Sequence, residues 1–185
     1  GAYQFGNFLD RRAGAPTSRL EHDAFMFVAN VGYTFADAWA TPRLAIEYCY
    51  ASGDSNPTNN THETFDNLFP TNHKFYGYMD FISLQNIQDV RAILQLKPHP
   101  RLSIAIEGHA FWLADTHDNF YNVGGAPRGG ITPTAGNNYG INPGYDSFLG
   151  TEIDVIAGYA LTRFAQLEVG YGHFFAGDYI VSSLS

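Results

Sequence analysis

Apolar and polar residues alternate with a period of two along much of this 185-residue chain. In residues 102–113, for example, Ile106 and Trp112 share one face, while Glu107 and His109 lie on the other. Successive side chains of a β-strand point to opposite faces of a sheet, so this pattern predicts a strand. The alternation predicts seven strands, at residues 2–8, 23–35, 43–50, 89–96, 102–113, 151–161 and 165–175.

The two faces of these strands differ in charge. One face is apolar and aromatic, and Asp23 and His173, which lie near strand ends, are its only acidic, basic or histidine residues. The other face mixes small, polar and charged residues. A shift of one residue would move every side chain to the opposite face, so the assignment of inside and outside depends on this register.

The connections between the strands differ strongly in length. Short connections at 36–42, 97–101 and 162–164 alternate with long polar loops near 9–22, 54–76 and 116–147. We expect residues 75–88, where the alternation breaks, to be an extended but irregular piece leading into the strand at 89–96. Tight turns at one end and long loops at the other are typical of outer-membrane barrels. The pattern therefore predicts an all-β fold, an antiparallel transmembrane β-barrel with an up-and-down meander, as a single domain over residues 1–185.

A second fold remains compatible with the alternation. In a soluble sandwich or a lipocalin-like barrel, the apolar face would point inward and form a packed core. The length of the strands and the inequality of the loops favour the membrane barrel. So does the mixed face, which has few charges and many Gly and Ala residues for a surface in full contact with water.

Composition excludes several classes of protein. The formal charge of −8 argues against nucleic-acid binding, which needs a basic surface. Aromatic residues make up 16% of the chain, so it can bury enough apolar surface to fold. The single cysteine, Cys49, excludes an internal disulfide framework. No run approaches the roughly 20 apolar residues of a membrane-spanning helix, and we expect no signal peptide in the first residues as printed.

Three long runs resemble the alginate-export family of outer-membrane proteins. They are NLFPTNHKFYGYMD at 67–80, EGHAFWLAD at 107–115 and GHFFAGDY at 172–179, and the resemblance spans about residues 43–180. It implies a large β-barrel pore in the outer membrane of a Gram-negative bacterium. Family members are considerably longer, so the resemblance also implies that this chain is a C-terminal portion of a larger barrel.

We expect the mixed face to line a water-filled pore that carries hydrophilic solutes or an exported polysaccharide by passive passage. Eight side chains are predicted to line it: Arg43, Glu47, Arg91, Glu107, His109, Glu152, Asp154 and Glu168. Acidic residues outnumber basic ones on this wall, which predicts mild cation selectivity and does not favour a polyanionic cargo. The expected partners are the lipid bilayer and the solute, with no nucleic acid.

Two alternatives of other classes stay open. One is a structural barrel that encloses a separate partner protein. The other is a hydrolase that uses Glu107 and His109, which lie two residues apart on one strand face. The sequence has none of the common hydrolase or phosphate-binding motifs, so we expect no catalytic residues, no cofactor and no metal.

Isolated residues in the predicted loops suggest weaker sites. Residues 62–66 contain imidazole and carboxylate ligands, but lack the spacing of a calcium or zinc site. His73, Lys74 and Arg128 could contact an anionic cargo at the mouth of the pore. Cys49 is expected on the lumen face as an inert small residue.

Overall fold

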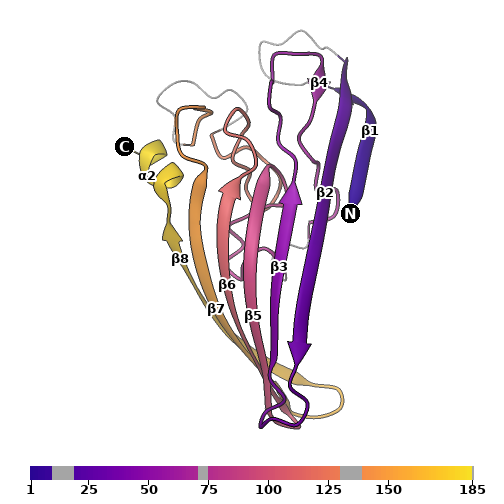
Figure 1. Ribbon diagram of the computed structural model, residues 1–185, viewed down its shortest axis with the longest axis vertical. Helices are drawn as coiled ribbons and strands as arrows, with labels where there is room; N and C mark the ends of the chain where they lie inside the picture. The colour runs from indigo at the N-terminus through magenta and orange to yellow at the C-terminus, as the bar shows by residue number, and fades with distance from the viewer. Residues whose placement is uncertain (10–18, 71–74, 130–138, 185) are drawn as a thin grey trace.

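The computed structural model describes residues 1–9, 19–70, 75–129 and 139–184 (Figure 1). Within these ranges the chain forms eight strands and one short helix. They are β1 (Ala2–Leu9), β2 (Arg19–Thr34), β3 (Arg43–Ala51), β4 (Thr61–His62), β5 (Ile87–His99), β6 (Leu102–Leu113), β7 (Phe148–Ala160), β8 (Gln166–Ala176) and α2 (Asp178–Leu184).

Seven of the strands form an antiparallel meander in the order β1-β2-β3-β5-β6-β7-β8. These are the seven strands predicted from the alternation, so the all-β, up-and-down fold is confirmed. The two-residue strand β4 was not predicted and pairs in parallel with β2. The sheet is not closed, because β1 and β8 are its two edges and do not pair with each other. The short turns gather at one end of the curved sheet and the long loops at the other (Figure 1).

Several strand boundaries differ from the sequence prediction, among them the start of β2 and the end of β5. β2 begins at Arg19, so the last four residues of the loop predicted near 9–22 belong to the sheet. These residues pair with the end of β1, where Leu20 lies opposite Phe8. β5 extends to His99 through an irregular register between Leu96 and His99, which leaves only two residues before β6. In both cases a strand is lengthened because its neighbour supplies hydrogen-bond partners beyond the alternating stretch.

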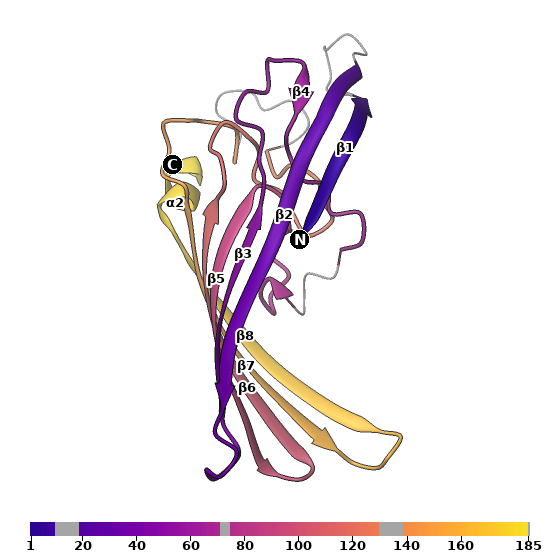
Figure 2. The same cartoon turned by 45° about the vertical axis from the view of Figure 1, so that its right-hand side comes forward.

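The apolar core lies on the concave face of the sheet, in the half nearer the long loops. Phe111, Leu113 and Leu149 from the strands are buried there against Ile82 and Phe120 from the loops. The helix α2 was not predicted, and its Tyr179 and Ile180 complete the same cluster. Figure 2 shows the loops folded back over the concave side of the curved sheet. The described loop residues of this cluster therefore fill space beside the strands.

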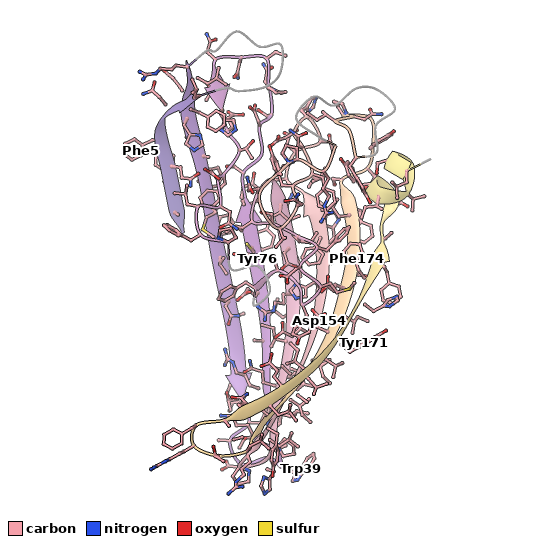
Figure 3. All side chains as sticks on the ribbon, turned by 180° about the vertical axis from the view of Figure 1, so that it is seen from behind. Phe5, Trp39, Tyr76, Asp154, Tyr171 and Phe174 are labelled. Carbon is pink, nitrogen blue, oxygen red and sulfur yellow. The ribbon has the colours of Figure 1, made fainter. Side chains whose placement is uncertain are left out.

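Many large apolar side chains lie outside the core, on the convex face of the sheet. Val31, Ile46, Val169 and Tyr171 are exposed there, together with many other large apolar residues. Figure 3 shows Phe5 and Tyr171 projecting outward from the two edge strands, while Asp154 and Phe174 lie between the edges. A sheet with an apolar outer face and charged groups inside is the inverse of a soluble sandwich.

The helical part of the described chain contains nothing long and apolar enough to cross a membrane.

Candidate functional site

The eight side chains predicted to line the pore share the concave face of the sheet. Most of them contact one another or the loops on this side. Glu168 is assigned by alternation, because it lies on the same face of β8 as Gly170 and Gly172, which are in close contact with the loop residues Tyr78 and Met79. Arg43 and Glu168 lie toward the end with short turns, and the other six lie near the middle of the sheet.

Arg91 is the centre of a buried ion network across three strands. Its Nη1 donates to Oε1 of Glu47 on β3 at 3.1 Å, and its Nε donates to Oε2 of Glu107 on β6 at 2.8 Å. Nη2 donates to the same Glu107 oxygen. Hydrogen bonds between ionised groups are stronger than neutral ones, and the planar guanidinium group holds both carboxylates at once. The network therefore fixes β3, β5 and β6 relative to each other.

His109 pairs with Asp89 rather than with Glu107. Its Nδ1 lies 2.9 Å from Oδ2 of Asp89, whereas its Nε2 is 3.8 Å from Oε2 of Glu107, too far for a hydrogen bond. Because a carboxylate only accepts, Nδ1 is the donor. The imidazole ring also stacks on Phe111, with 5.1 Å between ring centroids. Glu107 and His109 thus share one face of β6, as predicted, but are not hydrogen-bonded to each other.

Asp89 is a site residue that the sequence prediction missed. It is buried, and it lies two residues before Arg91 on the same face of β5. That spacing was the available signal, because it places both side chains in the row of charges across the sheet.

Residues 75–86, which we call the inner segment, lie against the concave face and are held there by two carboxylates of β7. The backbone N–H of Tyr78 donates to Oδ2 of Asp154 at 3.2 Å, and that of Met79 donates to Oε1 of Glu152 at 2.9 Å. Both acidic side chains are buried. The predicted extended piece at 75–88 is thus an irregular segment over 75–86 that folds into the interior of the curved sheet, and its last two residues belong to β5.

Three glycines allow this close approach. Gly77 has a φ of 95°, and a Cβ at this position would lie 2.7 Å from Oε1 of Glu152. On β8, a Cβ at Gly170 would collide with the ring of Tyr78, and one at Gly172 would lie 2.8 Å from Cγ of Met79. The inner segment fits because these positions carry no side chain.

The structure corrects the prediction that the acidic residues of this wall face water. Glu107, Glu152 and Asp154 are buried, Glu47 is half-buried, and Glu168 is exposed. The guanidinium group of Arg91 and the amides of the inner segment replace the water that these carboxylates would otherwise bind. Most of the water-facing charge on which the prediction of cation selectivity depends is therefore absent.

The loop candidates take structural roles. His62 stacks on Phe8 at 3.7 Å between ring centroids, and its Nδ1 lies 3.1 Å from that of His22. Cys49 is buried. In the parts of the chain that the structure describes, no three His, Cys, Asp or Glu side chains are placed to hold a metal ion. His73 and Lys74 lie outside the described residues.

Arg128 packs among the loops instead of facing outward. Its guanidinium carbon lies 4.1 Å from the ring centroid of Phe81 and 4.8 Å from that of Phe120, and Nη2 donates to the carbonyl oxygen of Phe81. Burial lowers the pKa of Arg128. The side chain thus joins the inner segment to the 116–129 loop through cation–π contacts.

Aromatic rings on the convex face lie at two levels. Near the loop end, Tyr50 stacks on Phe25 and Phe27 at 5.4 and 5.8 Å between centroids. Near the turn end, Tyr33 and Phe35 make an edge contact at 4.9 Å. Six residues separate the two levels along β2, or about 20 Å at roughly 3.3 Å per residue. This spacing is close to the apolar band of roughly 25 Å that membrane barrels present between their aromatic girdles.

A family model described as alginate export matches residues 1–183, which is essentially the whole chain. No curated protein matches the chain.

Proposed function

The chain belongs to the alginate export family, and from this premise we propose that it forms a wall of an outer-membrane channel through which hydrophilic solutes pass without a chemical step. Membership supports an outer-membrane export or porin-like role in general. The observation that carries the proposal is the opposition of the two faces of one sheet. Large apolar residues are exposed on the convex face, and ion pairs and polar contacts lie on the concave face.

The charges of the concave face favour a small hydrophilic solute over a polyanionic polysaccharide as the cargo. A wall that attracts a polymer of uronic acids needs free cationic side chains. Arg91 is bound by two glutamates, and Arg128 is enclosed by two phenylalanine rings. Arg43, which is half-buried and donates to Asn30, is the cation of the predicted lining set that has no carboxylate partner among the described residues.

Conductance in planar lipid bilayers tests this proposal directly. The purified protein should add discrete steps of ion current, because a polar interior lets hydrated ions cross. Alginate oligomers added to either chamber should leave the current unchanged if small solutes are the cargo. Silent protein under all salt conditions would contradict the channel, and a concentration-dependent block by alginate would instead assign the polysaccharide.

In our proposal the inner segment narrows the channel. A side chain at Gly77 should therefore displace the inner segment and widen the channel. Gly77→Val places carbon atoms against the Glu152 carboxylate and strains a backbone with φ of 95°. We expect a loss of about 1–3 kcal/mol of stability and a larger single-channel conductance than in the wild type. Gly124→Ala, where a Cβ would meet only Asn122 Oδ1 at 3.4 Å, is the matched control. Equal conductance of the two variants would show that the inner segment does not restrict the current.

The two alternatives have less support. The hydrolase would use Glu107 and His109, but both are buried and not hydrogen-bonded to each other. A barrel that encloses a separate protein needs space on the concave face, and the chain's own loops already occupy the half of that face nearer to them.

A further inference from the structure

Three buried polar atoms beneath the inner segment have no hydrogen-bond partner. They are Oε2 of Glu152, Oδ1 of Asp154 and Nε2 of His109. These residues are 0%, 1% and 3% exposed. Buried polar atoms without partners are uncommon in folded proteins, because each has lost its hydrogen bonds to water. The cluster is therefore incomplete as a set of protein atoms alone.

The same region has more negative than positive side chains. Carboxyl groups come from Glu47, Asp89, Glu107, Glu152 and Asp154. Among the described residues, the cationic groups of this cluster are Arg91 and His109, which bind the first three of these carboxylates. For Asp154 the nearest of them is His109, with 3.9 Å between Nε2 and Oδ2. Two adjacent carboxylates that are both ionised and both buried repel each other and lose hydration energy.

A single proton would supply the missing partner of both carboxyl oxygens and remove the repulsion between them. Glu152 and Asp154 lie two residues apart on the same face of β7, and each has one buried oxygen without a partner. We propose that Glu152 and Asp154 form a binding site for one exchangeable proton, shared between Oε2 of Glu152 and Oδ1 of Asp154, and that this proton holds the inner segment on the sheet. The other oxygen of each group still accepts the amide of Met79 or Tyr78.

Several ionisable side chains face the pair from the elements packed around it. The ionisable side chains near the pair are Glu47 on β3, Asp89 and Arg91 on β5, Glu107 and His109 on β6, and Tyr78 and Asp80 in the inner segment. The residues of β8 that contact the inner segment here are Gly170 and Gly172, which carry no side chain. Arginine stays charged, and Glu47, Asp89 and Glu107 are each bound by Arg91 or His109. Loss of the shared proton leaves two repelling carboxylates, so the inner segment should detach as the pH rises.

Hydrogen–deuterium exchange of the folded protein in detergent micelles measures this detachment and does not depend on ion conductance. The peptide that covers residues 75–86 should lose at least about tenfold of its protection between about pH 5 and about pH 9, after correction for the intrinsic exchange rate. A peptide from β6 shows whether the sheet itself stays folded. The effect of this proton on a channel rests on the proposed function, but its effect on the inner segment does not. If the conductance test fails, the exchange experiment still shows whether the inner segment detaches as the pH rises.

Isosteric variants separate a bound proton from other causes. Glu152→Gln places an N–H where the proton lies, so its inner segment should keep the same protection at both pH values. Asp154→Asn should behave likewise. Glu168→Gln, on the same face but exposed, should keep the pH dependence of the wild type.

Three outcomes would overturn the proposal. The first is pH-dependent protection in Glu152→Gln equal to that of the wild type. The second is greater protection at high pH than at low pH in the wild type. The third is protection at high pH that returns on addition of CaCl2 and disappears with EDTA, which would assign a divalent cation to the site instead of a proton.

Discussion

Replacement of Arg91 by Met should lower the free energy of unfolding by about 3–5 kcal/mol, since it leaves buried carboxylates without a cation. Arg91 binds Glu47 and Glu107 with three nitrogen atoms, and 9% of its side chain is exposed. Removing one member of a buried pair costs more than the pair itself contributes, because the remaining charge cannot recover its water. Urea unfolding in detergent micelles, followed by the fluorescence of Trp39 and Trp112, measures the loss.

A rescue experiment separates charge from packing. Adding Glu47→Gln and Glu107→Gln to Arg91→Met removes the unpaired charges and should recover about half or more of the lost stability. Arg43→Met is the matched control, since Arg43 is half-buried and donates only a long, 3.5 Å hydrogen bond to Oδ1 of Asn30 within the described chain. That variant should cost less than about 1 kcal/mol. Equal losses in Arg91→Met and Arg43→Met would show that the network does not stabilise the sheet.

The strands of the meander could be predicted from the sequence because period two is a local property. Each stretch from β1 to β8 alternates between an apolar and a mixed face, and the burial pattern of β6 follows this alternation residue by residue from Ile106 to Leu113. The helix α2 could not be predicted in the same way. Ile180 and Val181 favour a strand by their intrinsic preference, but Tyr179 and Ile180 are buried against the loops, and this packing outweighs that preference.

The fold of the inner segment depends on residues far away in the chain. Tyr78 and Met79 lie on Gly170 and Gly172 of β8, about ninety positions later. A run of residues that breaks the alternation indicates only that a regular strand ends. Nothing in residues 75–86 alone specifies whether they extend into solvent or fold onto the sheet.

The sequence placed most of the site's charges on one face but could not pair them. Which side chains meet depends on the register between strands, and β5 and β6 are offset by the irregularity between Leu96 and His99. Arg91 lies opposite His109 in that register, and the long side chains reach their diagonal neighbours instead. Asp89 and Glu107 thereby become the partners of His109 and Arg91.

Arginine at position 46 should show which face of the sheet meets lipid. Ile46 is 60% exposed on the convex face, between the two levels of aromatic rings, and lies opposite Ala92 on β5. A cation on the lipid face near the middle of a bilayer costs about 2–4 kcal/mol, so Ile46→Arg should lose that much stability when unfolding is measured in lipid vesicles. Gln95→Arg places the same cation on the exposed end of the concave face and should change stability by less than about 1 kcal/mol. If Ile46→Arg were as well tolerated as Gln95→Arg, the convex face would meet water, and the membrane orientation of the sheet would be wrong.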